Sequence, residues 1–276
     1  MVLMDQPLLK REVPMADTST PAEQIPVRVL GGPTAVFVYG GLRFLTDPTF
    51  DAPRDYPVPG ALLTKTAPSS ATPADLGPID VVLLSHDEHP DNLDASGRAL
   101  LADVPLTLTT PGGARRLGAG VRGLADWESV ELNRVGGGTV TVTGVPALHG
   151  PGARAEVEAV TGQVVGFVLT GDDLPTVYVS GDNASLALVK EIAERFGPVD
   201  TALLFAGAPR FTDLFDGAPI VLDSAQAAEA AAILGARRVV PVHYDSWAHF
   251  TEGQDELVDA FEDAGLLGRL DLGDRG

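Results

Sequence analysis

The chain has no cysteine among its 276 residues. Disulfide bonds and thiolate zinc sites are therefore excluded, and any bound metal must be held by histidine and carboxylate ligands. The chain also lacks an apolar run long enough to span a bilayer, and its N-terminal residues lack the pattern of a secretory signal. Because these absences are typical of cytoplasmic proteins, we expect a cytoplasmic protein without a membrane partner.

Basic residues are scarce: 19 Lys and Arg against 38 Asp and Glu give a formal net charge of −19. Such a charge repels phosphate backbones, so we expect no nucleic-acid partner, and solubility alone can explain the excess of acid. The acidic run over residues 252–263 is expected to form the solvated face of a helix. The expected partner is a small-molecule substrate, and the chain could also form a homo-oligomer.

The length and the 45% hydrophobic content are enough for one sizeable α/β domain. Residues 1–25 are polar and have no periodic pattern, so we expect a flexible leader followed by a single domain over residues 26–276. Residues 51–78 are rich in proline and are expected to form a long surface loop.

Apolar runs and their spacing predict the regular elements in the rest of the chain. The predicted strands are residues 27–30, 34–39, 42–46, 79–84, 106–109, 130–132, 139–143, 164–169, 176–180, 201–205, 239–242 and 269–272. The predicted helices are residues 92–101, 111–117, 185–196, 224–234 and 252–264. Hairpins and β-α units follow each other twice, which predicts two sheet-plus-helix halves stacked sheet to sheet, a four-layer α/β sandwich.

All five histidines fall in three short loops. The densest loop, residues 85–92, contains His86, His89 and Asp91 directly after a buried apolar run. Three further predicted strands end in a similar loop, which presents His149, Asp182 or His243. Because strand ends can meet at one edge of a sandwich, these side chains can converge on a metal, and their chemistry suits Zn, Mn or Fe rather than Mg or Ca. The alternative is a turn rich in polar caps, with Asp91 capping the next helix.

Five short motifs, in this order along the chain, resemble one family of hydrolases. They are Gly31-Gly32-Pro33-Thr34, Leu45-Thr46-Asp47-Pro48, Ser85-His86-Asp87, Ser180-Gly181-Asp182 and Pro241-Val242-His243-Tyr244. In order and spacing they resemble the metallo-β-lactamase-fold hydrolases, and within them the L-ascorbate-6-phosphate lactonase-like branch. The resemblance covers nearly the whole chain after residue 26 and implies an αββα sandwich, in agreement with the predicted order of elements.

The resemblance implies a centre for one or two divalent transition metals, Zn or Mn, with Fe as a further candidate. A first metal would be held by His86, His89 and His149, with Asp182 as the bridging or fourth ligand. A second metal would be held by Asp91, Asp182 and His243, with weak help from Asn92.

The first loop departs from the family pattern His-x-His-x-Asp-His. Counted back from Asp91, Asp87 falls where the first histidine should be, whereas His86 occupies that place when the count starts at the strand end. We favour His86 as the first histidine ligand, because the position directly after the strand sets the geometry of the ligand. We expect Asp87 to support the ligands without binding the metal itself. Asn92 replaces the last histidine. An amide oxygen is a weaker ligand than imidazole, so we expect one tight and one weak metal.

The implied reaction is hydrolysis of a lactone, an ester or a phosphodiester by a metal-activated water. Asp91 would orient that water or act as a general base, and Asp182 would hold it between the metals. His249 has three expected roles: lining the pocket, donating a proton to the leaving group, or capping the helix near residue 252. Asp47 would support a ligand histidine or form a plain Asp-Pro turn. Because Asn92 is unusual, the alternative is a metal-binding, catalytically weak protein that acts as a sensor or binds a partner.

Overall fold

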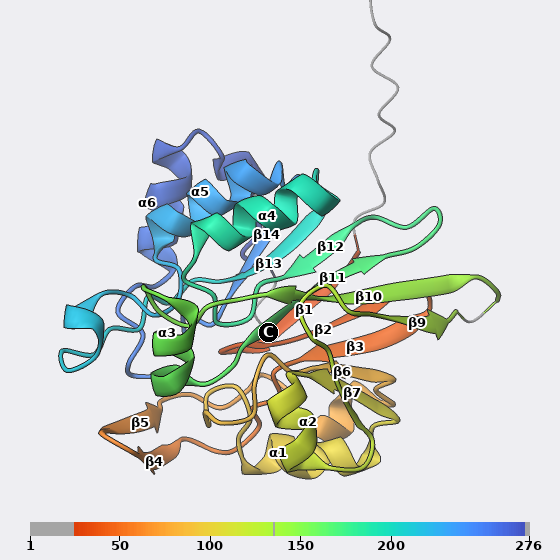
Figure 1. The fold of residues 1–276 in the computed structure, drawn as a ribbon, viewed down its shortest axis with the longest axis horizontal. Helices are drawn as coiled ribbons and strands as arrows, with labels where there is room; N and C mark the ends of the chain where they lie inside the picture. The colour runs from red at the N-terminus through yellow and green to blue at the C-terminus, as the bar shows by residue number, and fades with distance from the viewer. Residues whose placement is uncertain (1–24, 135, 274–276) are drawn as a thin grey trace, which may run out of the picture.

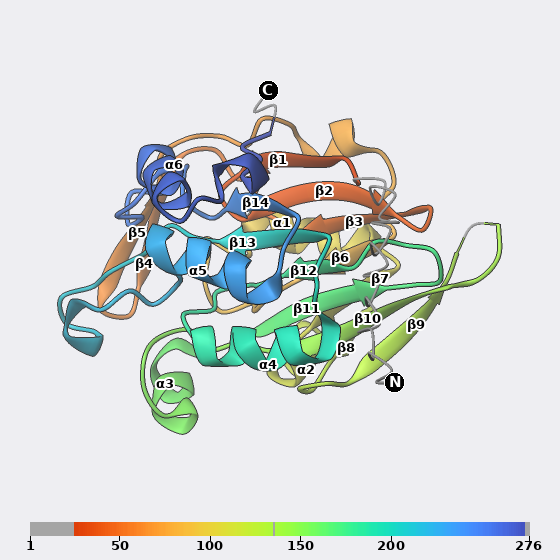
Figure 2. The same ribbon diagram turned by 90° about the horizontal axis from the view of Figure 1, so that it is seen from above.

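The computed structural model describes residues 25–134 and 136–273 and arranges them in four layers, helices on sheet on sheet on helices (Figure 1). Figure 2 shows the second sheet with its helices in front and the first sheet behind it. Each large sheet has six strands, in the order β1-β2-β3-β6-β7-β8 and β14-β13-β12-β11-β10-β9. The predicted αββα sandwich is confirmed.

The first sheet begins as an antiparallel meander and continues as parallel strands. Its strands are β1 (Val27–Gly31), β2 (Thr34–Tyr39), β3 (Leu42–Thr46), β6 (Val81–Leu83), β7 (Leu106–Thr109) and β8 (Val121–Gly123). Gly40 and Gly41 both have positive φ, 58° and 82°, as the tight turn between β2 and β3 requires. Helices α1 (Ala95–Leu100) and α2 (Pro111–Leu117) connect the parallel strands and cover the outer face (Figure 1).

The second sheet is built in the same way, with antiparallel strands first and parallel strands last. Its strands are β9 (Ser129–Asn133), β10 (Thr139–Pro146), β11 (Val165–Thr170), β12 (Val177–Val179), β13 (Thr201–Phe205) and β14 (Arg238–Val242). The outer helices are α4 (Leu186–Phe196), α5 (Ser224–Leu234) and α6 (Gln254–Asp263). Asp223 caps α5, because its side chain accepts a hydrogen bond from the backbone N–H of Gln226.

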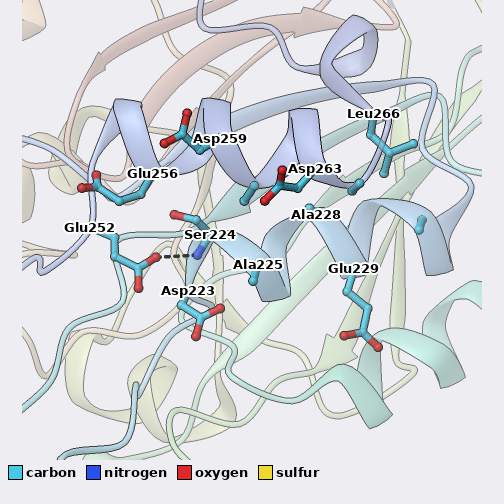
Figure 3. Close-up of a pocket in the computed structure, with 13 residues that line it drawn as sticks. Asp223, Ser224, Ala225, Ala228, Glu229, Glu252, Glu256, Asp259, Asp263 and Leu266 are labelled. Carbon is cyan, nitrogen blue, oxygen red and sulfur yellow. Dashed lines mark hydrogen bonds between the residues drawn. The ribbon is translucent and has the colours of Figure 1, made fainter.

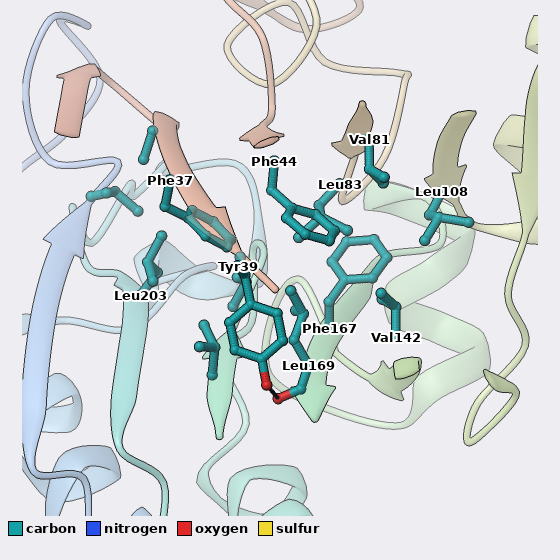
Figure 4. Packing of buried hydrophobic residues seen from close by; sticks show 14 of the residues in the cluster. Phe37, Tyr39, Phe44, Val81, Leu83, Leu108, Val142, Phe167, Leu169 and Leu203 are labelled. Carbon is teal, nitrogen blue, oxygen red and sulfur yellow. Dashed lines mark hydrogen bonds between the residues drawn. The ribbon is translucent and has the colours of Figure 1, made fainter. Parts of the chain in front are cut away.

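The main core lies between the two sheets. Phe37 and Phe44 stack with ring centroids 5.5 Å apart, and Phe167 from the second sheet packs beside them (Figure 4). A second core joins the second sheet to its helices and includes buried alanines of α5. Between α5 and α6 a pocket remains, which is lined by Ala228 and by acidic side chains such as Glu256 and Asp259 (Figure 3). Leu257 and Phe261 point inward from α6 while the acidic side chains of that helix are mostly exposed, which confirms the predicted solvated face.

Several elements differ from the predicted ones. The expected loop over residues 51–78 contains a hairpin, β4 (Arg54–Val58) and β5 (Ala61–Lys65), and a short 3₁₀ helix over Pro73–Leu76. Helix α3 (Arg154–Thr161) and strand β8 were not predicted. The predicted last strand is wrong, because residues 269–272 make a single bridge, from Leu270 to Val239. Helix α1 begins at Ala95 and not at residue 92, because Asp94 caps it.

A buried ion pair ties the β4–β5 hairpin to the body of the protein. Lys65 Nζ lies 3.2 Å from Asp94 Oδ2, and the two side chains are only 1% and 0% exposed. The same ammonium donates to the carbonyl oxygen of Thr49 at 2.9 Å. Since Asp94 also caps α1 through the backbone N–H of Gly97, the pair joins the hairpin to the helix that follows the histidine-rich loop.

The expected leader lies outside the described residues except for its last member. Ile25 packs in the core between the sheets, and its carbonyl oxygen accepts a hydrogen bond from Arg238 Nη1. Among the helices that the structure describes, none is both long and apolar enough to cross a membrane.

Candidate metal centre

The loops after four strands meet at one edge of the sandwich. The loop after β6 brings His86, His89 and Asp91, and the loops after β10, β12 and β14 bring His149, Asp182 and His243. Their nitrogen and oxygen atoms form two groups, within each of which all atoms lie within 4.8 Å of one another. His86, His89, His149 and Asp182 form the first cluster, and Asp91, Asp182 and His243 form the second. The structure therefore brings the six predicted histidine and aspartate ligands together, with Asp182 shared.

The first cluster holds its imidazoles with their nitrogen lone pairs inward. His149 Nδ1 lies 2.8 Å from the carbonyl oxygen of Ile220, which can only accept, so Nδ1 carries the proton and Nε2 is bare. That bare nitrogen lies 3.4 Å from Asp182 Oδ2. Burial lowers the pKa of His149 to about 4, and it lowers the pKa of His86 well below its usual value. Both rings are therefore neutral at pH 7, which metal ligation requires.

Asp47 and Ser85 orient His86. Ser85 donates to Asp47 twice, from its backbone N–H and from its hydroxyl, both at 2.6 Å. The hydroxyl oxygen then accepts from His86 Nδ1 at 2.9 Å, which leaves Nε2 free to face the cluster. Asp47 thus reaches the histidine, as the first of its two expected roles requires, and it does so through Ser85, which the sequence alone did not indicate. Burial raises the pKa of Asp47 to about 7.

The second cluster places an imidazole between two carboxylates. His243 Nε2 lies 3.3 Å from Asp91 Oδ2 and 3.6 Å from Asp182 Oδ1. Although burial works against both charged forms, the carboxylates raise the pKa of His243, and His249 with His243 holds the pKa of Asp91 well below its usual range. In the second cluster the charged forms of the histidines and the carboxylates therefore stabilise one another.

The backbone of His243 is held by the glycine turn between β1 and β2. His243 has a φ of 59°, a left-handed conformation that is strained for a histidine. Its N–H donates to the carbonyl oxygen of Gly32 at 2.7 Å, and the N–H of Gly32 donates to Asp245 Oδ1 at 2.7 Å. The Gly31-Gly32 turn thus fixes the loop after β14, a role without a signal in the sequence.

Asn92 lies in the centre but does not present its oxygen as expected. Its side-chain nitrogen faces acceptors on two sides, Asp47 Oδ2 at 3.1 Å and Asp182 Oδ1 at 3.1 Å. Because only the NH₂ end of an amide can donate to carboxylates, the amide oxygen points away from Asp182. In this structure the Asn92 side chain donates a hydrogen bond to the shared carboxylate, and its amide oxygen is buried without a partner among the described residues, so its role as a weak oxygen ligand stays a prediction.

Asp87 lies in neither cluster. Its carboxylate faces α2, where Arg116 Nε donates to both oxygens at 3.1 and 3.0 Å. The expectation that Asp87 supports the centre is corrected, because this ion pair holds the side chain away from it. Of the two candidates for the first histidine position, His86 is the one that lies in the cluster.

His249 belongs to neither cluster and lies directly beside the second. Its Nε2 is 2.9 Å from Asp91 Oδ2, and its ring stacks near Phe211 with centroids 6.0 Å apart. The expected capping role is wrong, because α6 begins at Gln254 and Gly253 is its cap. His249 lines a cavity, in agreement with the first of its expected roles.

A cavity of about 650 Å³ opens onto both clusters. His89, His149 and Asp91 form its polar end, and three segments form its walls: the turn of the β4–β5 hairpin, the end of α3 and residues 209–220. In Figures 1 and 2 these segments project from the same end of the molecule. Such a volume is in the range of small-molecule sites.

The donor set fits a divalent transition metal. Ring nitrogens and carboxylate oxygens face one another here, and His86 Nε2 lies only 2.8 Å from His89 Nδ1. Asp91 Oδ1 and Asp182 Oδ2 are buried and accept no hydrogen bond within the described residues. Buried acceptors without partners are costly, and a cation would satisfy them. Mixed imidazole and carboxylate ligands suit Zn, Mn or Fe.

Comparison with known proteins agrees with this geometry. The profile of the beta-lactamase superfamily domain matches residues 42–244. A UPF0173 metal-dependent hydrolase of Methanosphaerula palustris is 32% identical over 191 residues, which cover 66% of this chain and 76% of that protein. One from Pyrococcus horikoshii is 26% identical over 239 residues, covering 82% and 88%.

Solved structures share the fold. An isothiocyanate hydrolase from Delia radicum gut bacteria superposes with a TM-score of 0.74 at 24% identity, covering 91% of this chain and 96% of that one. The metallo hydrolase Igni18 of Ignicoccus hospitalis gives 0.67 at 20% identity, covering 91% and 96%. With its fold, its converging histidines and aspartates and these relatives, the chain belongs to the beta-lactamase superfamily, in the UPF0173 family of metal-dependent hydrolases.

Proposed function

We propose that the protein hydrolyses a lactone, an ester or a phosphodiester with one or two divalent transition metals, Zn or Mn, and with Fe as a further candidate. The observation that carries the proposal is the convergence of six buried or half-buried histidines and aspartates beside a cavity of about 650 Å³. A bound metal supplies a Lewis acid and lowers the pKa of a water to about 7. His86, His89, His149 and Asp182 would hold the first metal, and Asp91, Asp182 and His243 the second.

Asp91 and His249 would move the protons. Asp91 Oδ1 has no hydrogen-bond partner in the described residues, so it is free to orient the attacking water, or to accept its proton where the second metal is absent. Asp91 Oδ2 meets His249 Nε2, and His249 lines the cavity where the leaving group would lie. Asp91 would thus orient the imidazole of His249, and His249 would donate a proton to the leaving oxygen as the scissile bond breaks, while the proton of the water stays on Asp91 or passes to solvent.

The test is a substrate panel with protein of known metal content. Zn-loaded and Mn-loaded protein is assayed against lactones, esters and phosphodiesters, and the bound ions are counted by elemental analysis. We expect turnover of at least one class, and its loss after chelator treatment. Absence of turnover on every class by protein with metal bound would contradict the proposal.

A second candidate, a catalytically weak metal-binding sensor, is favoured by one observation. The Asn92 amide donates to the shared Asp182, at the place where the family pattern has a histidine ligand. The Asn92→His variant tests this role. If the loss of a ligand disabled the enzyme, the variant should bind a second equivalent of metal and gain activity, measured by elemental analysis and initial rates.

If activity of Asn92→His instead falls, the asparagine is part of a working site and the hydrolase proposal is favoured. Asn92→Ala is the control, because it removes the amide donors without adding an imidazole. A gain that occurs in Asn92→Ala as well would come from releasing Asp182 and not from a new ligand.

A further inference from the structure

We propose that the substrate is an uncharged ester or lactone with an apolar acyl part, which the cavity walls select over phosphate-bearing compounds. This inference rests on the proposed hydrolase function and narrows its substrate class. The substrate class is inferred from the residues in the walls of the cavity, whereas the hydrolase function is inferred from the histidines and aspartates at its polar end.

The walls are apolar on all three contributing segments. The apolar side chains that line the cavity are Val58 and Leu63 of the hairpin, Val160 of α3, and Phe211, Leu214 and Ile220. Val160 is 54% exposed, which is unusual for a large apolar residue and is explained if a ligand covers it. Apolar walls with a few polar groups at one end are typical of sites for largely apolar small molecules.

The charged groups around the cavity disfavour a phosphate. Arg210 is the only lysine or arginine among the described lining residues, and its guanidinium lies 3.5 Å from both Asp223 and Glu252. Asp213 also lines the cavity, as does Glu88, which is paired with Arg116 at 2.9 Å, so the lining offers no unpaired cation among the described residues. Phosphate sites normally offer several free cations or backbone N–H groups. An uncharged group needs no such partner.

The orientation of helix α3 also disfavours a phosphate in the cavity. Val160, Thr161 and Gly162, which line the cavity, are at the C-terminal end of the helix. The C-terminal end of a helix carries partial negative charge, and the last turn of α3 has no basic residue to offset it. Helix ends that bind phosphate are N-terminal ends. The wall therefore selects against anions both by its side chains and by its backbone.

The test compares p-nitrophenyl acetate, butyrate and hexanoate with bis(p-nitrophenyl) phosphate on metal-loaded protein. We expect the esters to have the higher kcat/KM, which should rise by up to about fourfold for each methylene that the walls bury. The Val160→Lys variant should lose at least about tenfold in kcat/KM for the hexanoate, and less for the acetate. Val38→Lys is the matched control, because Val38 is 46% exposed and does not line this cavity.

The outcomes separate the two proposals. Faster phosphodiester hydrolysis, no dependence on acyl length, or an equal loss in Val160→Lys and Val38→Lys would overturn the substrate class and leave the hydrolase function standing. No turnover of these four compounds or of any lactone of the substrate panel by protein with metal bound would overturn the hydrolase function and this inference with it.

Discussion

Replacing His86 by alanine is expected to remove the metal of the first cluster and to lower kcat/KM by about a thousandfold or more. The reason is that a metal Lewis acid contributes several kcal/mol to transition-state stabilisation. His86 is fully buried and its Nε2 faces the cluster, so the variant removes one of the predicted ligands from inside the protein. Elemental analysis after dialysis and initial rates on the preferred substrate check this result.

His249→Ala is the matched control for His86→Ala, because it removes an imidazole from the same centre without removing a predicted ligand. We expect it to keep its metal while losing about 10²-fold to 10⁴-fold in rate, as for a proton-transfer group. The Ser85→Ala variant should bind metal about 10-fold to 100-fold more weakly than the wild type, a loss intermediate between those in His249→Ala and His86→Ala. The reason is that it removes the hydrogen bond that orients the ring of His86. Full metal content in His86→Ala, or loss of metal in His249→Ala, would contradict the assignment of the clusters.

Replacing Lys65 by methionine is expected to lower the free energy of unfolding by about 3–5 kcal/mol, the largest stability effect that we predict. The change leaves the Asp94 carboxylate buried without its cation, at the point where the hairpin meets α1. Urea unfolding followed by circular dichroism measures the effect.

Two variants control for side effects of Lys65→Met. Lys190→Met exchanges the same groups at an exposed position of α4 and should change stability by no more than about 0.5 kcal/mol. Adding Asp94→Asn to Lys65→Met should recover part of the loss, because the orphaned charge is removed. If Lys65→Met is as stable as Lys190→Met, the buried pair contributes no net stability.

The sandwich was predictable because its inner strands are buried on both faces. Thr201–Phe205 is buried at every position and appears in the sequence as a continuous apolar run. The same runs locate the strand ends, and therefore the loops that carry the histidines. Sequence and structure agree best where burial is complete.

The β4–β5 hairpin and α3 were not predictable in the same way. Strand β4 is mostly exposed and includes Pro57, which weakens a strand signal, and α3 buries only Val157 and Thr161. Both elements are held by contacts with distant residues, such as that between Lys65 and Asp94, that leave no local pattern.

Within the site, sequence spacing predicted which side chains meet and not how they are oriented. Asp87 forms an ion pair with Arg116, which lies 29 residues later in the chain, and its carboxylate therefore does not face the metal centre. The donor role of Asn92 depends on the positions of Asp47 and Asp182, which come from two different sheets. Counting along one loop cannot reveal such partners.

The walls of the cavity and the groups at its polar end belong to different stretches of chain, which bears on how such proteins diverge. The histidines and aspartates sit at strand ends that the double sandwich keeps in register, whereas the hairpin turn, the end of α3 and residues 209–220 project beyond it. One coupling between the two is the hydrogen bond from His149 to Ile220, and it uses a backbone carbonyl. Because any residue at position 220 provides that oxygen, evolution or design can rewrite the walls for a new substrate and leave the reaction chemistry intact.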